Sequence, residues 1–175
     1  MNPLVAEKAR KIKLLLMDVD GVLTNGGIII DSRGVESKVF DVKDGHGLKL
    51  LMRAGVEVGI ISGRESPVVA LRAKELGISI LHQKVLKKVE VLEKILAERG
   101  LKDDEVAYIG DDVVDLPILI RVGLAVAVAD AMPEVKERAD YITSRPGGRG
   151  AVRELAELLL KAQDKWAPLT ESYRG

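Results

Sequence analysis

Short apolar runs alternate along this chain with longer segments of helical periodicity. The runs are continuously apolar rather than alternating, which is typical of strands buried on both faces: 12–17, 56–61, 78–81, 105–109, 124–128 and 140–142. The intervening segments predict helices over 44–54, 65–76, 85–99, 112–122, 132–138 and 149–163. Strands that alternate with helices predict an α/β fold, a Rossmann-like, doubly wound parallel sheet with the strand order 3-2-1-4-5-6.

Two segments depart from this alternation. Residues 26–44 contain an apolar stretch, a turn at Asp31-Ser32-Arg33-Gly34 and a second stretch of alternating character, which predicts a β-hairpin flap directly after the first strand. Residues 164–175 contain Pro168 and no strong period, so we expect an extended tail there. The length of 175 residues fits a single domain over 1–175.

The composition of the chain excludes several classes of binding partner and of site chemistry. Lys plus Arg and Asp plus Glu both number 27, so there is no basic excess for a nucleic-acid backbone or an anionic membrane. The absence of cysteine excludes disulfides, thiolate metal sites and cysteine nucleophiles. The first residues lack the apolar core of a signal peptide and no apolar run is long enough to span a bilayer, so we expect a cytoplasmic protein.

Polar side chains follow three of the predicted strands. In a doubly wound sheet the carboxyl ends of the first, second and fourth strands lie side by side, where ligands bind. Those ends carry Asp18 and Asp20, then Ser62-Gly63-Arg64, then Asp111, Asp112 and Asp115. A cluster of carboxylates needs a cation, and ligands that are all oxygen favour Mg²⁺.

These motifs resemble those of a known family. DVDGVLT, ISGR, a lysine near the start of the helix after the third strand, and GDDVVD stand in the order of the four motifs of the haloacid dehalogenase superfamily. KVFDVKDGHGLKLL, GRES and GGRGAVRE further resemble its subfamily of 3-deoxy-D-manno-octulosonate 8-phosphate phosphatases. The C-terminal domain of acylneuraminate cytidylyltransferases shares many of these features, so the motifs alone leave the substrate open.

The resemblance implies a Mg²⁺-dependent phosphomonoesterase that acts through an aspartyl-phosphate on this sugar phosphate, in lipopolysaccharide sugar biosynthesis. Asp18 would be the nucleophile and Asp20 the general acid and base. Ser62 and a lysine would stabilise the phosphoryl group. Spacing favours Lys88, although Lys84 and Lys87 lie nearby. The metal ligands would be Asp18, Asp20 and Asp111, with Asp112 and Asp115 behind them or orienting the lysine.

Substrate contacts are also implied by the resemblance. Arg64 and Arg72 would bind the sugar carboxylate, because arginine recognises planar anions through two parallel hydrogen bonds. The remaining expected substrate-binding residues are Asp20, Asp41, Val42, Lys43, Asp44, Gly45, Gly63 and Lys88.

The sequence has room for a hairpin but none for a separate cap domain. A lone hairpin is marginal in water and leaves strand edges unpaired. We therefore expect hairpins from several subunits to pair, in a homotetramer of the kind that the subfamily forms, with the tail of one subunit near the site of another. Three alternatives stay open: a nine-carbon keto-acid 9-phosphate or a broader substrate set, a receiver-like phosphoacceptor, and a non-catalytic regulatory domain.

Overall fold

The computed structural model describes residues 2–171 and 173. Its main sheet has the order β5-β4-β1-β6-β7-β8, which confirms the predicted order 3-2-1-4-5-6, and every neighbouring pair is parallel. The strands are β1 (Leu14–Met17), β4 (Glu57–Ile61), β5 (Ile80–His82), β6 (Val106–Gly110), β7 (Leu124–Ala127) and β8 (Tyr141–Ile142).

The register of the sheet fixes where the functional loops emerge. β1 is buried along its whole length and lies between β4 and β6. Met17, its last residue, is paired with Ile60 on one side and with Ile109 on the other. The residues that follow these three strands therefore leave the sheet together at its carboxyl edge.

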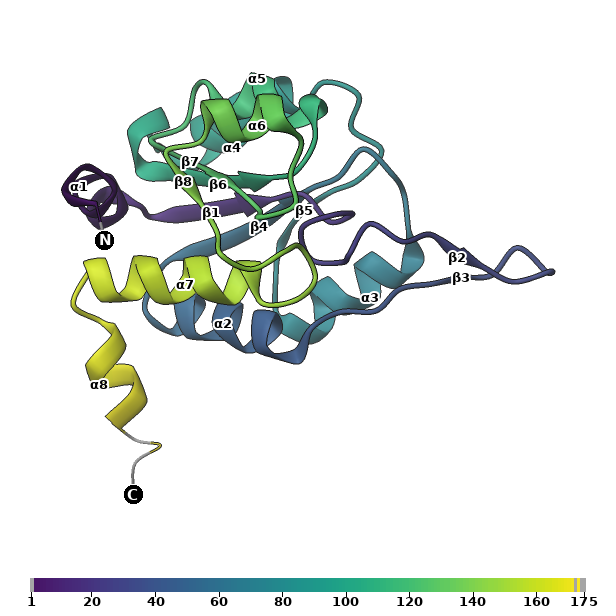
Figure 1. Cartoon of the computed structure of the whole chain (residues 1–175), viewed down its shortest axis with the longest axis horizontal. Helices are drawn as coiled ribbons and strands as arrows, with labels where there is room; N and C mark the ends of the chain where they lie inside the picture. The colour runs from purple at the N-terminus through teal and green to yellow at the C-terminus, as the bar shows by residue number, and fades with distance from the viewer. Residues whose placement is uncertain (1, 172, 174–175) are drawn as a thin grey trace.

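Helices cover both faces of the sheet (Figure 1). One face carries α2 (Val42–Arg53), α3 (Pro67–Leu76) and α7 (Ala151–Ala162), and the other carries α4 (Lys88–Arg99), α5 (Leu116–Leu119) and α6 (Pro133–Arg138). The structure also has two short 3₁₀ turns, η1 (Asp103–Glu105) and η2 (Val113–Asp115).

Several helix boundaries differ from those predicted. The segment 112–122 is broken into η2 and the short α5, because Asp112 caps a separate 3₁₀ turn through the amide of Val113. α4 begins at Lys88 rather than at 85, since the amides of Lys84 and Val85 donate to the carbonyls of Arg64 and Ser62. α1 (Pro3–Lys11) was not anticipated, although Asn2 accepts from the amide of Leu4 and Pro3 suits a first helical position.

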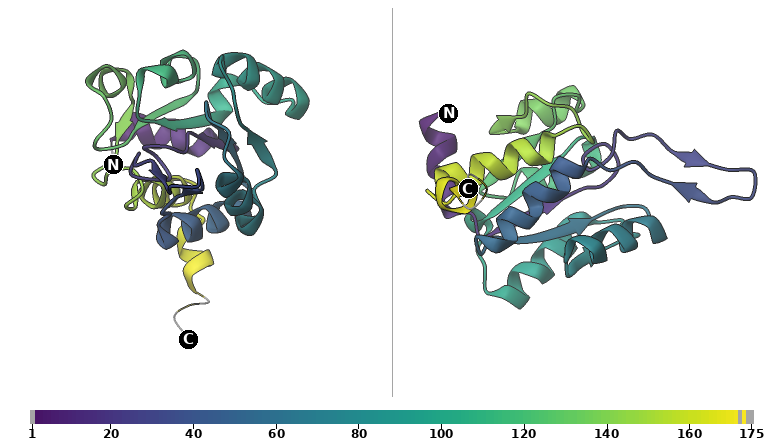
Figure 2. Two further views of the ribbon diagram at one scale, coloured as in Figure 1. Left: turned by 90° about the vertical axis from the view of Figure 1, so that its right-hand side faces the viewer. Right: turned by 90° about the horizontal axis from the view of Figure 1, so that it is seen from below.

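The predicted hairpin forms and projects from the carboxyl edge of the sheet (Figures 1 and 2). Its antiparallel strands are β2 (Ile29–Ile30) and β3 (Glu36–Ser37). At the tip, the Asp31 carboxylate accepts from the amides of Arg33 and Val35, and Gly34 has a φ of 79°. The hairpin ends earlier than predicted, because residues 42–44 belong to the first turn of α2.

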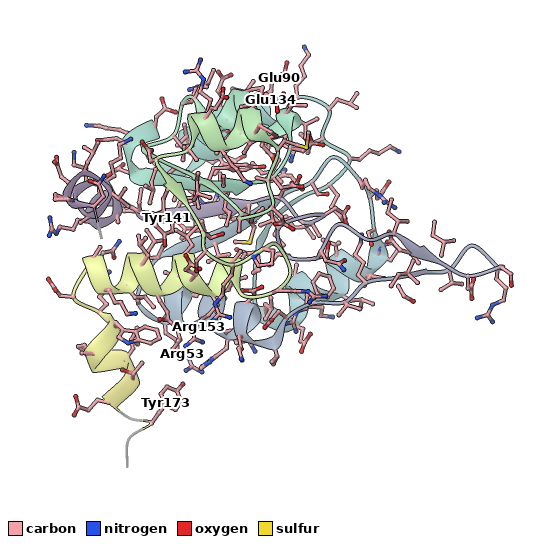
Figure 3. All side chains as sticks on the ribbon, in the orientation of Figure 1. Arg53, Glu90, Glu134, Tyr141, Arg153 and Tyr173 are labelled. Carbon is pink, nitrogen blue, oxygen red and sulfur yellow. The ribbon has the colours of Figure 1, made fainter. Side chains whose placement is uncertain are left out.

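The C-terminal segment was expected to be extended, and that expectation is wrong over α8 (Trp166–Glu171). The Arg153 guanidinium lies 5.3 Å from the ring centre of Trp166, and Arg53 donates to the hydroxyl of Tyr173 at 2.8 Å (Figure 3). Positions 172, 174 and 175 of the predicted tail lie outside the described residues. This segment is at the opposite end of the molecule from the hairpin (Figure 1).

Membrane insertion was not expected from the sequence. No helix in 2–171 combines the length and the apolar character that a bilayer-spanning segment needs.

Candidate active site

A cavity of about 420 Å³ opens at the carboxyl edge of the sheet. Its wall comes from the loops after β1, β4 and β6 and from the start of α4. The lining residues are Asp18, Asp20, Ser62, Gly63, Arg64, Val85, Leu86, Lys88, Asp111, Asp112 and Val114. The structure thus gathers at one edge eight of the residues predicted for the site.

Asp18 is the first residue after β1, and its position is fixed by the sheet. Its amide donates to the carbonyl of Ile109, and its Oδ1 accepts from the amide of Val19 at 2.6 Å. Its Oδ2 lies 2.8 Å from Nζ of Lys88. Burial raises the pKa of Asp18 while the Lys88 ammonium opposes that rise, so the carboxylate depends on nearby cations to stay ionised.

Lys88 is almost fully buried at the start of α4. Its Nζ lies 2.7 Å from Oδ1 of Asp115 as well as close to Asp18. Burial alone would lower the Lys88 pKa, but these two carboxylates outweigh burial and raise it, so the side chain remains an ammonium ion. The other two lysines considered, Lys84 and Lys87, are exposed and pair with Glu65 and Glu90.

Asp115 lies beneath the cavity floor and is completely buried. Its Oδ1 accepts from Lys88 and, at 2.6 Å, from the hydroxyl of Tyr108, while its Oδ2 accepts from the amides of Asp111 and Asp112. Burial and the charge of Asp115 raise the pKa of Tyr108 well above its usual value, so that hydroxyl remains a donor. Both oxygens of Asp115 are thus engaged, and Oδ1 is in direct contact with the lysine.

Asp111 is the carboxylate that most lacks a partner. Its Oδ1 is buried and accepts no hydrogen bond from any described residue. Burial, followed by the charges of Asp115 and Asp18, raises the Asp111 pKa to about 7. Oxygens of these three carboxylates lie within 4.8 Å of one another. The unpaired oxygen and the all-carboxylate donor set fit a divalent cation such as Mg²⁺ beside Asp18 and Asp111.

We call Asp18, Lys88, Asp111 and Asp115 the strand-end cluster. A second group of charges, which we call the hairpin-base cluster, consists of Asp20, Glu36, Lys38 and Arg64. Nζ of Lys38 lies 2.5 Å from Oδ1 of Asp20 and 3.3 Å from Oε1 of Glu36. Arg64 donates to the same oxygen of Glu36 at 2.9 Å, and its Nε lies 4.0 Å from Oδ2 of Asp20.

Glu36, Lys38 and Tyr108 were not predicted as part of the site. Glu36 is in β3 and Lys38 is the first residue after it, and a spacing of two residues in an extended chain places both side chains on one face. The alternation was a signal for a shared face, but the sequence did not show that this face meets Asp20.

Two further predicted residues shape the cavity through backbone contacts. Ser62 is buried, and its hydroxyl accepts from the amide of Arg64 at 3.3 Å. Asp112 is exposed and caps η2 by accepting from Val113 at 2.7 Å, so it neither touches Lys88 nor orients it.

Six residues expected to bind substrate do not line the cavity of this chain: Asp41, Val42, Lys43, Asp44, Gly45 and Arg72. The first five form the cap and the first turn of α2. The Asp44 carboxylate is buried and accepts from the amides of Gly150 and Arg153, at the start of α7. Arg72 lies over the ring of Phe40 at 5.7 Å and pairs with Glu75.

The fold and the cavity are those of a haloacid dehalogenase-like hydrolase: a doubly wound sheet with an aspartate after β1, a buried lysine on α4 and further aspartates after β6. The model of the family described as haloacid dehalogenase-like hydrolase matches residues 71–155.

More similar proteins define the family further. The chain is 46% identical over 165 residues to the 3-deoxy-D-manno-octulosonate 8-phosphate phosphatase KdsC of Salmonella typhimurium, covering 94% of this chain and 88% of that protein. A crystal structure of the phosphatase of this name from Yersinia pestis superposes with a TM-score of 0.92 at 44% identity, over 93% of this chain and 88% of that one. The chain belongs to the 3-deoxy-D-manno-octulosonate 8-phosphate phosphatase family.

Among the similar solved structures is a complex with ligands. The phosphatase of this name from Moraxella catarrhalis, in complex with a magnesium ion, a phosphate ion and a KDO molecule, superposes with a TM-score of 0.97 at 41% identity, over 99% of both chains.

Proposed function

We propose that this protein is a Mg²⁺-dependent phosphomonoesterase that hydrolyses 3-deoxy-D-manno-octulosonate 8-phosphate to the free sugar acid and phosphate. The observation that carries the proposal is the arrangement around Asp18, a buried carboxylate 2.8 Å from the Lys88 ammonium at the floor of an open cavity. The relatives named for this activity, and the one solved with magnesium, phosphate and KDO, support the choice of substrate.

The residues divide the reaction between them. A carboxylate oxygen of Asp18 attacks phosphorus and forms an aspartyl-phosphate, and the bond from phosphorus to the sugar oxygen breaks. Asp20 gives its proton to the departing sugar oxygen, and then takes a proton from the water that attacks phosphorus and releases phosphate from Asp18. Asp18 and Asp20 are thereby returned to their starting states.

Lys88 and Ser62 stabilise the phosphoryl group during both steps. The Lys88 ammonium, held by Asp115, faces the oxygens that become more negative, and Ser62 can donate its hydroxyl hydrogen to one of them. Mg²⁺ would be held by the carboxylates of Asp18 and Asp111 and the backbone carbonyl of Asp20, and it would neutralise phosphate charge there.

Arg64 is the residue that we expect to bind the sugar carboxylate. It lines the cavity and its guanidinium is partly exposed, so a substrate carboxylate can reach it. Arg72 and the 41–45 segment contact substrate only if the assembled protein or bound sugar brings them to a cavity.

We further propose that the protein acts in the cytoplasm as a homotetramer. The hairpin exposes Ile28, Ile29 and Ile30, each more than half accessible, and paired hairpins would bury them. The C-terminal helix α8 lies at the opposite end of the molecule from the hairpin (Figure 2). We expect the segment of a neighbouring subunit, rather than a chain's own, to approach the cavity. A monomeric mass by light scattering, together with full activity, would contradict the tetramer.

The decisive experiment is phosphate release from a panel of keto-acid sugar phosphates with Mg²⁺. We expect the highest kcat/KM for the eight-carbon 8-phosphate, and a higher value for a nine-carbon 9-phosphate would move the assignment to that substrate. Asp20→Asn should lower turnover without abolishing the phosphorylation of Asp18. A protein that became phosphorylated but released no phosphate would instead be a phosphoacceptor, and one that did neither would be a binding domain.

A further inference from the structure

The hairpin-base cluster joins three separate parts of the chain around one carboxylate. Asp20 lies in the loop after β1, and Arg64 follows β4. Glu36 is in the returning strand of the hairpin, β3, and Lys38 directly follows that strand. The cluster pairs two cationic side chains, Lys38 and Arg64, with two carboxyl groups, Asp20 and Glu36. Asp20 must hold a proton when it acts as the general acid.

Lys38 is the most buried member of the cluster. Its side chain is only 1% exposed, and both of its partners are carboxylates. A lysine is rarely buried to this degree unless its ammonium is paired, because removing the charge from water is costly. Its ammonium is enclosed between Asp20 and Glu36, so the side chain is not displayed to solvent as a ligand for substrate.

Glu36 fixes the other side of Lys38. Besides Lys38 and Arg64, it accepts a short hydrogen bond from the hydroxyl of Ser66, whose amide donates to Gln83 at 2.8 Å. The hairpin strand is thus tied to the loop after β4 and, through Gln83, to the segment after β5. Through these contacts, Glu36 holds Lys38 in place beside the cavity.

Asp20, in contrast, has few other constraints. Its side chain is 23% exposed, and no described residue other than Lys38 or Arg64 forms an ion pair with it. A general acid must lie within hydrogen-bond reach of the oxygen that it protonates, and a displacement of about 1 Å can cost on the order of 100-fold in rate. The position of this carboxylate therefore depends on the hairpin.

We propose that Lys38, held by Glu36, is a positioning residue that fixes the Asp20 carboxylate for proton transfer to the leaving group. The inference rests on the proposed function, in which Asp20 is the general acid. In this proposal, the hairpin contributes a positioning residue to the active site of the same chain.

The test compares two leaving groups in the Lys38→Met variant. The ratio kcat/KM reports the steps up to release of the leaving group, and a sugar alkoxide needs a proton at that point, whereas p-nitrophenolate leaves as a stable anion. We expect kcat/KM for the sugar phosphate to fall roughly 10- to 100-fold, and that for p-nitrophenyl phosphate to change by no more than about 3-fold. Lys38→Arg, which keeps a cation, should recover most of the loss.

Controls separate positioning from folding. Lys94→Met removes an exposed lysine that lies near Glu98 and should leave both substrates unaffected. Glu36→Gln keeps the shape of the anchor and weakens its hold on Lys38, so it should show the same leaving-group dependence with a smaller loss. If Lys38→Met does not fold, as judged by circular dichroism, Glu36→Gln and Lys38→Arg carry the test.

Equal losses for both substrates in the folded variants, or no loss for the sugar phosphate, would overturn the inference. A wild-type protein that ignores this sugar phosphate but cleaves another alkyl phosphate would refute the proposed function alone. The comparison of leaving groups would then be made with that alkyl substrate.

Discussion

The two charged clusters of the site both bury a lysine between carboxylates, yet they are built in different ways. In the strand-end cluster, Lys88 and its partners stand on or next to elements of the main sheet, and Asp115 is held by a tyrosine and two amides as well. In the hairpin-base cluster, Lys38 directly follows the two-residue strand β3 of the projecting hairpin. Backbone amides as well as side chains hold Asp115 in the first cluster, whereas Lys38 in the second is held by the carboxylates of Asp20 and Glu36.

This difference suits the chemistry proposed for each cluster. Attack on phosphorus requires a fixed nucleophile and a fixed positive charge, which buried strand ends provide. Asp20 has to exchange protons first with the leaving group and then with a water molecule. A position nearer to solvent and beside the hairpin suits that role. The predictions below test whether the two clusters differ in this way, beginning with the largest effect.

Removal of the nucleophile should abolish turnover. In Asp18→Asn the amide cannot form the acyl-phosphate, so phosphate release should fall by at least about 10⁴-fold. Asp104→Asn, an exposed aspartate at the other edge of the sheet, should keep normal activity. Near-normal activity of Asp18→Asn would show that the covalent mechanism is wrong.

Removal of the lysine in the strand-end cluster should cost stability as well as activity. Lys88→Met leaves Asp18 and Asp115 buried without their cation, and such uncompensated burial lowers the free energy of unfolding by about 3 to 5 kcal/mol. Urea denaturation measures this loss, with phosphate release measured alongside. Lys87→Met changes the exposed lysine that precedes Lys88. Its free energy of unfolding should be within about 0.5 kcal/mol of the wild-type value. A stable Lys88→Met protein would show that the buried carboxylates of this cluster do not depend on Lys88.

Mg²⁺ should stabilise the strand-end cluster through Asp111. At an Mg²⁺ concentration about 100 times its dissociation constant, the wild type should gain about 2.7 kcal/mol, measured as a rise in the unfolding midpoint. Asp111→Asn should lose most of that gain, and chelation by EDTA should stop turnover until Mg²⁺ is restored. Asp112→Asn changes a carboxylate that caps η2 and should keep the gain. The same gain in both variants would remove Asp111 from the metal site.

Among the described residues, Asp44 is a buried carboxylate without a lysine partner, so it shows how burial alters a carboxyl pKa when no ammonium ion is paired with it. Burial raises the pKa of Asp44 to about 6, from 3.8, although amides of Arg153 and Gly150 oppose the rise. The folded protein therefore holds the proton more tightly, and the contribution of Asp44 to stability is greatest below pH 4 and falls as the pH rises to 6. Relative to Asp44→Asn, the wild type should lose at most about 3 kcal/mol across that range in urea titrations. A difference that is constant with pH would contradict the raised pKa.

Much of the main sheet could be predicted because its signals are local. Continuous apolar runs identify strands that are buried on both faces, and the alternation with helices then dictates parallel pairing. The carboxyl ends of β1, β4 and β6 follow directly, so the residues after them could be expected to share a cavity. The predicted roles of these residues stay predictions until the variants are measured.

Signals that were weak or conflicting account for the differences. The only sequence signals for α1 are Asn2 and Pro3 at its start. α8 contains Pro168, which favoured the prediction of an extended segment, although proline is tolerated in a first helical turn. Asp44 followed a hairpin motif and was expected to face substrate, but α7 begins beside it and its amides take the carboxylate.

The sequence by itself determined the class of fold, the edge of the sheet that carries the site and the acids that stand there, because strand period and strand ends depend on neighbouring residues. Only the tertiary structure decided which side chains neutralise those acids. It buried Lys88 rather than Lys84 or Lys87 and brought Lys38 to Asp20. Ion pairs of this kind join loops that meet only after the sheet has formed, and no local pattern records which loops those are.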